Sequence, residues 1–485
     1  MASDVGRIVA RCYRDGVESI PALTRRRFLA LSAAATLAAC EARPAATGSP
    51  LPRAAAPAPS DSAPPASAAA TTSPSPVPPT PAPTPPTAQR TLYRDAALAD
   101  GRSSELQLGV SILVEAGRIA WIRPSDGEED PGSGELEIVD ASGATIVPGM
   151  VDAHSHVTLP GGAHWIDRIG DPPAALLEVA ERNGRLLSAA GVRWARDVGS
   201  PYVEDPIDGR RRALALGVRD RWRDRPEMPH LRAAGTWLDR AGSLPAAVHT
   251  VEASDADQLL ANAMGQLDDG ADFLKLYLDG PDPASSPWTA DEIERVVTAA
   301  HERGARVTAH AGRLSGARAG VLGGVDAIEH GFELDDDLAV EMAGRGTFLV
   351  STLAVMRSWL TFGRTTTLPR FAGAEGRRAI EERLERAQAS VGAARRAGVA
   401  IATGTDFGGG SLRANQLAWE VESLVAAGVE PWEALGAATW RGGEVLGIEE
   451  AGAIREGGPA DFFLAHGDPL TDPAALWRVW RVAWL

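Results

Sequence analysis

Lysine is almost absent from this chain: Lys275 is the single lysine among 48 basic residues, and all the others are arginines. Cysteine is also scarce, with two in 485 residues, which excludes a disulfide-bonded scaffold. The 64 acidic residues give a formal charge of −16, which disfavours binding of nucleic acid through a basic face. No apolar run reaches the roughly 18 residues that a membrane-spanning helix needs.

The first 40 residues have the pattern of a bacterial export signal. The segment Thr24–Leu29 resembles a twin-arginine signal, and an apolar, alanine-rich stretch follows over Phe28–Ala39. The phrase Leu37–Cys40 is similar to a lipobox, in which the cysteine is lipidated and becomes the new N-terminus. We therefore expect residues 1–40 to direct export across the bacterial cytoplasmic membrane. Lipid on Cys40 would anchor the protein to a membrane, on the periplasmic or cell-surface side; the alternative is a chance basic-then-apolar start.

Proline is concentrated in one segment, residues 41–90, which holds 15 of the 35 prolines. Alanine, serine and threonine fill most of the remainder. Such a composition buries too little apolar area to offset the entropy of ordering, so we expect a disordered, extended linker.

The rest of the chain, 44% apolar in its overall composition, predicts two domains. Short β runs separated by turns occupy 91–148, and a second β-rich segment covers 449–485, which together indicate a small β-sandwich domain built from both ends of the folded region. Residues 149–448 alternate short apolar strands with helices, which is typical of an α/β fold with parallel strands. Eight such units match a TIM (β/α)8 barrel. The strand candidates are Val151–His156, Val192–Val198, Leu231–Thr236, Asp272–Tyr277, Arg306–His310, Ala327–His330, Thr347–Ser351 and Val399–Thr405.

Helices are predicted between these strands and after the last of them. Thr289–Glu292 is a capping box in front of an amphipathic run over Ile293–Glu302, and Gly304 ends it. Two further helices are predicted after the eighth strand, over Asn415–Ala427 and Pro431–Leu446.

Polar side chains stand at the C-terminal ends of several predicted strands, where a TIM barrel carries its chemistry. The first strand ends in His154-Ser155-His156, and because side chains alternate along a strand, the two histidines face the same way and can bind one metal ion. The other candidates are Lys275 on the fourth strand, His310 on the fifth, His330 on the sixth and Asp406 after the eighth. Taken alone, His154 and His156 could be surface histidines, and Asp406 could be a helix N-cap.

This order of H-x-H, Lys, His, His and Asp resembles the amidohydrolase superfamily, in its binuclear branch. The resemblance covers nearly all of residues 92–485 and includes the phrases Pro148–His154 and Ala451–Leu470. Within that superfamily, the sequence most resembles the imidazolonepropionase-like and dipeptidase-like hydrolases. A Gly-Gly-His phrase found in many dipeptidase-like members is absent from 235–243, and imidazolonepropionases use one metal and lack the lysine, which weakens both specific assignments.

The resemblance implies two divalent metal ions, with zinc the leading candidate. His154, His156 and Asp406 would hold one ion, and His310 and His330 the second. Lys275, carboxylated by CO2, would bridge them together with a hydroxide. Burial and nearby cations can lower the pKa of a lysine to give the neutral amine that reacts with CO2, whereas arginine stays charged.

The reaction implied is hydrolysis of a C–N bond in an amide, peptide or cyclic amide, with the bridging hydroxide as nucleophile and Asp406 as the catalytic proton acceptor and donor. Tyr277 and Arg313 are candidates for contact with a small-molecule substrate. Two alternatives remain: hydrolysis of a lactone or phosphotriester on the same centre, and a non-enzymatic surface-binding lipoprotein.

Overall fold

The computed structural model describes residues 90–484, except 129–130, 132–134 and 245–247. Residues 88–485 form one compact unit, and the description below concerns its described part. The predicted export signal, the lipidation at Cys40 and nearly all of the predicted linker lie outside the described residues. Among the residues described, no helix combines the length and the hydrophobicity needed to cross a bilayer.

The eight predicted barrel strands are all present and run parallel. Three form one sheet in the order β10-β7-β6, and the other five follow one another in a second sheet, β13 to β17, extended by two short strands at its β13 edge. The first group is β6 Met150–Ser155, β7 Val192–Asp197 and β10 His230–Ala233. The second is β13 Leu274–Tyr277, β14 Val307–Ala311, β15 Ala327–His330, β16 Phe348–Ser351 and β17 Ile401–Thr403, with β11 Leu238–Arg240 and β12 Val251–Ala253 at the edge.

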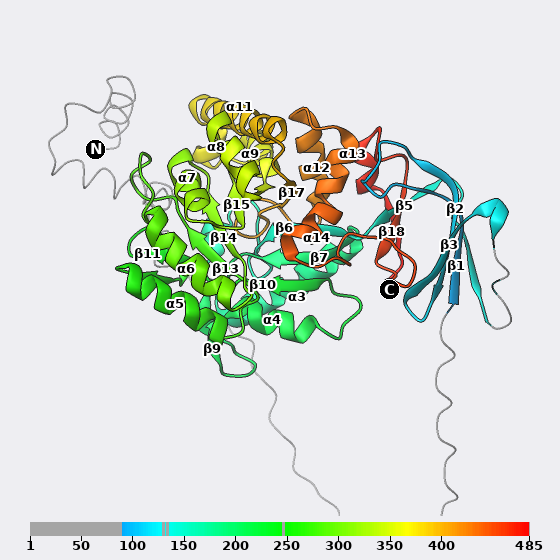
Figure 1. The fold of residues 1–485 in the computed structure, drawn as a ribbon, viewed down its shortest axis with the longest axis horizontal. Helices are drawn as coiled ribbons and strands as arrows, with labels where there is room; N and C mark the ends of the chain where they lie inside the picture. Colours follow the sequence, from blue (N-terminus) through cyan, green and yellow to red (C-terminus); the bar gives the residue numbers. More distant parts are fainter. Residues whose placement is uncertain (1–89, 129–130, 132–134, 245–247, 485) are drawn as a thin grey trace, which may run out of the picture. The chain divides into compact units, whose positions relative to one another are not determined.

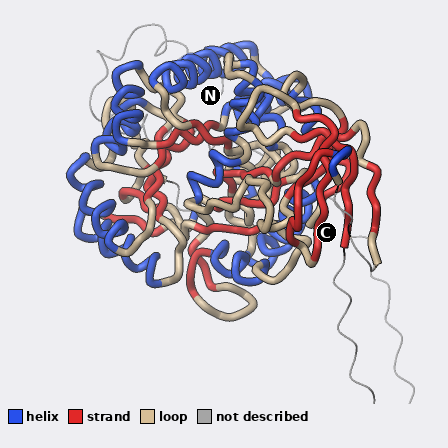
Figure 2. Tube along the Cα trace, turned by 45° about the vertical axis from the view of Figure 1, so that its right-hand side comes forward, coloured by secondary structure: helices blue, strands red, loops and turns tan. Residues whose placement is uncertain are grey.

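Backbone hydrogen bonds join the two sheets on both sides and close the barrel. Asp272 N–H donates to the Ala233 carbonyl at 2.8 Å, which links β10 to β13. Asp406 N–H donates to the His154 carbonyl at 2.8 Å, which links the segment after β17 to β6. The predicted TIM barrel is thus confirmed, and helices surround its strands (Figure 2).

The helices follow the strands in the expected alternation. The predicted capping box is confirmed on α6, where Thr289 and Glu292 cap each other reciprocally. The surrounding helices are α3 Pro173–Ala189, α4 Leu214–Trp222, α5 Ala256–Asp268, α6 Ala290–Glu302, α7 Leu314–Leu322, α8 Asp336–Arg345, α9 Leu353–Thr365, α10 Pro369–Ala372, α11 Ala374–Ala397 and α12 Leu417–Ala426.

The single helix predicted over 431–446 is wrong. Two helices, α13 Pro431–Ala437 and α14 Trp440–Leu446, meet at Thr439, whose φ of −126° and ψ of −109° are not helical. A Cβ at Gly442 would lie 2.5 Å from the Val151 Cβ. The break therefore turns α14 so that its backbone packs directly on β6.

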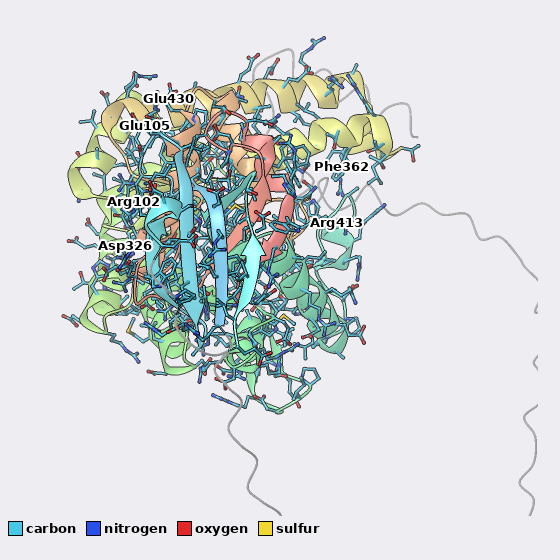
Figure 3. All side chains as sticks on the ribbon, turned by 90° about the vertical axis from the view of Figure 1, so that its right-hand side faces the viewer. Arg102, Glu105, Asp326, Phe362, Arg413 and Glu430 are labelled. Carbon is cyan, nitrogen blue, oxygen red and sulfur yellow. The ribbon has the colours of Figure 1, made fainter. Side chains whose placement is uncertain are left out.

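A separate sheet lies beside the barrel and takes strands from both ends of the described chain (Figures 1 and 3). Its order is β19-β18-β5-β1-β2-β3, with β4 paired to β1. Its strands are β1 Arg90–Leu98, β2 Gln107–Glu115, β3 Arg118–Pro124, β4 Glu137–Asp140, β5 Ala144–Pro148, β18 Phe462–His466 and β19 Val479–Val482. A short hairpin, β8 Tyr202–Glu204 with β9 Arg211–Ala213, completes the described strands.

A buried ion pair ties this sheet to the barrel. The Arg193 Nε on β7 donates to Oδ1 of Asp461, next to β18, at 2.7 Å. The same guanidinium donates to the Met228 carbonyl at 2.9 Å. Removing one partner of such a pair leaves an uncompensated buried charge, which typically costs about 3–5 kcal/mol.

Candidate metal centre

Three predicted ligands converge at the mouth of the barrel. Asp406 Oδ1 lies 3.4 Å from His154 Nε2 and 3.2 Å from His156 Nε2. Ligand atoms of these three residues all lie within 4.8 Å of one another, and they form the one such group of potential metal ligands among the described residues. Both histidines are buried, and 17% of the Asp406 side chain is exposed, so the group is reached from the mouth.

Hydrogen bonds on the side away from Asp406 determine which ring nitrogen of each histidine carries a proton. His154 Nδ1 is 2.7 Å from Glu329 Oε2, and His156 Nδ1 is 2.7 Å from the Gly199 carbonyl oxygen. A carboxylate and a carbonyl only accept, so each Nδ1 must donate its proton. The Nε2 of each ring then faces the same Asp406 oxygen. Once the Nε2 protons are lost, the two imidazole nitrogens and the carboxylate oxygen form the donor set of a divalent cation.

Lys275 lies beneath this group with its ammonium nitrogen buried. The residue is 1% exposed, and its Nζ has no hydrogen-bond partner among the described residues. Burial, aided by the Arg196 charge, lowers the pKa of Lys275 to about 8, against the opposing charge of Glu329. Burying an amine without a hydrogen-bond partner costs free energy of folding. Carboxylation of Lys275 and metal binding by the carboxylated group would give this atom a partner.

The second predicted pair stands next to the first group. The His330 ring centroid lies 4.6 Å from that of His154 and 4.6 Å from that of His310. His310 Nε2 is 3.3 Å from Asp279 Oδ2, which leaves Nδ1 as the ring atom available to a cation. His330 Nδ1 is 2.8 Å from the Thr352 hydroxyl. The structure therefore brings all six predicted ligands into one place, three of them as a tight group.

Backbone geometry is unusual at two of these residues. His330 has a φ of +73° and Asp406 a φ of +52°, both in the left-handed region that non-glycine residues rarely adopt. Along β15, alternation would place Glu329 inside the barrel and its neighbour His330 outside. The positive φ instead turns His330 back toward the mouth, so that consecutive residues both serve the centre.

Glycines let the segment after β17 approach the first two histidines. A Cβ at Gly404 would lie 2.3 Å from the His154 Cβ, and one at Gly409 would lie 2.2 Å from the His156 Cδ2. Neither clash is with the flexible end of a side chain. These two glycines are therefore required by close contact with the ligands.

Electrostatics around the centre favour anionic carboxylates and neutral rings at His154 and His330, whereas contact with the Asp406 carboxylate, against the effect of burial, raises the pKa of His156. Although burial opposes it, hydrogen bonds from His154 and His156 hold the pKa of Asp406 well below its usual range. Burial and the neighbouring His310 hold the pKa of His330 well below its usual value. The charges of Arg196 and Lys275 lower the pKa of Glu329 despite its burial. Metal ligation needs neutral imidazoles, so a bound cation would take the place of the proton that the Asp406 carboxylate favours on His156.

Sequence reasoning missed the residues that orient the ligands: Glu329, Asp279 and Thr352. The strand register offered a signal for Glu329, because it pairs with His310 and therefore shares the face of Tyr277 and His310. A carboxylate on the inner face of a barrel strand indicates a partner inside. No comparable signal exists for Asp279 or Thr352, which lie in the turns after their strands.

The two predicted substrate residues lie beside His310. The Tyr277 ring stacks on it with centroids 4.3 Å apart and an interplanar angle of 14°. Arg313 Nη1 donates to the Gly280 carbonyl at 2.7 Å, and its backbone N–H points to Asp279 Oδ1 at 3.3 Å. The Arg313 side chain is thus partly committed to the loop after β13.

Comparisons with known proteins agree with this geometry. Residues 145–482 match the family model described as "Amidohydrolase family". An uncharacterized protein of Mycobacterium tuberculosis is 30% identical over 377 residues, which cover 76% of this chain and 91% of that protein. An imidazolonepropionase of Anaeromyxobacter dehalogenans is 28% identical over 410 residues, covering 78% and 90%. The crystal structure of a Xaa-Pro dipeptidase with bound methionine superposes with a TM-score of 0.68 at 23% identity, covering 81% and 97%.

Proposed function

The chain belongs to the amidohydrolase family, and on that premise we propose that it is a binuclear metallohydrolase that cleaves a C–N bond in an amide, peptide or cyclic amide. Proteins that it is similar to include an imidazolonepropionase and, by fold, a Xaa-Pro dipeptidase, whose names denote hydrolysis of such bonds. The observation that carries the binuclear assignment is the orphaned, buried Nζ of Lys275, which lies within electrostatic reach of His154, His330 and Asp406.

The donor set divides into two groups. His154, His156 and Asp406 would hold one cation, His310 and His330 the other, and a carboxylated Lys275 would bridge. When bound, two divalent cations, zinc being the leading candidate, would polarise the scissile carbonyl and lower the pKa of the attacking water. The anionic carbamate has two oxygens, so it can satisfy two cations from a single side chain, which a histidine at this position cannot.

Asp406 is the residue proposed to move the proton. Its carboxylate is the one ligand of the first group with appreciable exposure, so it faces both the buried histidines and the barrel mouth. It takes the proton from the attacking water and delivers it to the leaving nitrogen, which must be protonated to depart. Tyr277 and the Arg313 loop border the same opening and contact the substrate in this proposal.

Export and lipid anchoring remain part of the proposal on the strength of the sequence alone. The twin-arginine pattern would carry the folded protein across the membrane, and Cys40 would receive the lipid. Replacing Cys40 with alanine should release the protein from the membrane fraction; unchanged membrane association would contradict the anchor.

Substrate profiling tests the reaction class. The metal-loaded protein is assayed on N-acyl amino acids, dipeptides, cyclic amides, lactones and phosphotriesters. We expect hydrolysis within the first three classes, with loss of at least about 100-fold in His154→Asn. The matched control is His466→Asn, which replaces an exposed histidine on β18 and should leave the rate unchanged. Turnover confined to lactones or phosphotriesters would reassign the reaction, and no turnover in any class would contradict the proposal.

A further inference from the structure

An exposed arginine on α11, Arg383, has no ion pair or hydrogen bond to any residue that the structure describes. Its guanidinium carbon lies 5.5 Å from the centroid of the Phe332 ring. Arg383 shares this arrangement with Arg102 and Arg211, which pack on Trp440 and Tyr202, but Arg383 alone of the three packs on a ring next to a proposed metal ligand.

The position of Arg383 on its helix places it at the barrel mouth. Seven residues further along α11, Ser390 donates its hydroxyl to the Gly331 carbonyl and accepts the Leu334 N–H at 3.0 Å. Seven residues are close to two helical turns, so Arg383 and Ser390 share one face of α11. That face therefore runs along the segment that follows His330 (α11 is the gold helix at the upper edge of Figure 1).

A chain of rings connects Arg383 to the candidate metal centre. The Phe332 ring lies 5.3 Å from that of His330, and the His330 ring lies 4.6 Å from that of His310. Arg383 therefore borders the side of the opening where His310 and His330 stand. The charge of Arg383 also acts on the hydroxyl of Tyr277, on the other side of His310.

The carboxylates of Asp279 and Glu333 act on Arg383 electrostatically, but neither forms an ion pair with it among the described residues. Asp279 already accepts the Gly312 N–H at 3.0 Å and lies 3.3 Å from His310 Nε2. The other arginine of this region, Arg313, donates to the Gly280 carbonyl. Arg313 is thus bound to the loop, whereas the Arg383 guanidinium packs on Phe332 and keeps its hydrogen-bond donors without a partner among the described residues.

We propose that Arg383 binds a carboxylate of the substrate, so that the enzyme selects N-acyl amino acids, dipeptides included, in which a free carboxylate lies close to the scissile C–N bond. This inference rests on the proposed function and deepens it. A planar guanidinium binds a carboxylate through two parallel hydrogen bonds, and the Phe332 ring packs against the guanidinium of Arg383. An uncharged amide would gain neither the charge nor the paired hydrogen bonds.

The expected signature is a change in KM and in selectivity with a preserved kcat. Arg383→Gln should raise KM for an N-acetyl amino acid by about 10- to 100-fold and leave the corresponding N-acetyl amino acid amide unaffected, because the lost interaction is made equally in the ground state and the transition state. Arg383→Lys should recover part of the loss, since it keeps the charge and lacks the fork. Arg378→Gln is the matched control: Arg378 is exposed on the same helix, five residues earlier and on another face.

A binding measurement separates this inference from the proposed function. The metal-loaded parent and variants are titrated calorimetrically with a free L-amino acid product and with its amide. Weaker binding of the amino acid, and not of its amide, in Arg383→Gln supports the carboxylate site even if no tested amide bond is hydrolysed. Equal binding by the parent, Arg383→Gln and Arg378→Gln, or equal KM values for acid and amide substrates in the parent, would overturn it. Loss of hydrolysis with carboxylate binding intact would instead contradict the proposed reaction alone.

Discussion

Glu329 Oε2 lies 2.7 Å from His154 Nδ1, and both side chains are almost completely buried. The second oxygen of the same carboxylate accepts hydrogen bonds from Arg196 and from the Thr308 hydroxyl. The Arg196 charge keeps Glu329 anionic, and the anion keeps the proton of His154 on Nδ1. His154 therefore offers Nε2 toward Asp406 only because three other side chains hold it in that state.

Replacing Glu329 with glutamine should weaken metal binding by about 10- to 100-fold, the range typical for partners that orient ligating histidines. Glutamine keeps the shape but can offer its NH2 to His154, which would favour the wrong tautomer, and it leaves the Arg196 charge unpaired. The metal retained after dialysis against graded concentrations of a chelator measures the change.

Glu385→Gln is the control for this variant, because Glu385 is exposed on α11, away from the centre. It should retain metal like the parent. A Glu329→Gln protein that also retains metal like the parent would show that the contact with His154 is structural packing alone.

Gly404→Ala should disturb the centre by overpacking. Its Cβ would lie 2.3 Å from the Cβ of His154, and a backbone-linked clash of this size is relieved only by moving the β6 histidines. We expect destabilisation of about 1–3 kcal/mol and reduced metal content. Gly344→Ala, in α8 with open space around the new methyl group, should be neutral or slightly stabilising. Urea unfolding with metal analysis of the folded protein tests both, and equal stability of the two variants would contradict the account.

Glu420 gives a pH-dependent prediction at a site that contacts none of the proposed ligands. Its buried carboxylate accepts the Ser351 hydroxyl at 2.6 Å and the Leu353 N–H at 3.0 Å, at the start of α9. Burial raises the pKa of Glu420 from 4.5 to about 8. A raised carboxyl pKa stabilises the fold fully below about pH 4.5, and this contribution is lost as the pH rises toward 8.

The stability of the parent relative to Glu420→Gln should therefore fall with increasing pH, by up to about 1.4 kcal/mol per pH unit, and level off above pH 8. Urea unfolding at several pH values between 5 and 9 measures it. Glu294→Gln, at an exposed position on α6, should show a constant difference. A constant difference for Glu420→Gln as well would mean that its carboxyl group stays ionised in the fold.

The barrel could be predicted from sequence because each strand is a short apolar run bounded by turn residues, with a helix before the next. The six ligand candidates were recognisable because strand ends meet at one mouth. The break at Thr439 could not be predicted, because it follows from the close packing of Gly442 on Val151, two segments nearly 300 residues apart.

The direction of the His330 side chain could not be predicted from the sequence either. Simple alternation along β15 directs Glu329 inward and His330 outward, and only the positive φ of His330 brings both to the centre. Arg383 was also not predictable, because its place at the mouth depends on the register of a 24-residue helix against the segment after β15. Such features arise from tertiary contacts and leave no local pattern.

The most direct test of the binuclear account is the metal content of the purified protein, measured by elemental mass spectrometry after growth with zinc and bicarbonate. The parent, Lys275→Arg and Lys275→Met are compared, with circular dichroism to confirm that each variant is folded. We predict about two metal ions per chain in the parent and one or fewer in both variants, because neither replacement can form the carbamate. One ion per chain in all three folded proteins would contradict a bridging role for Lys275 and reduce the centre to a single site at His154, His156 and Asp406.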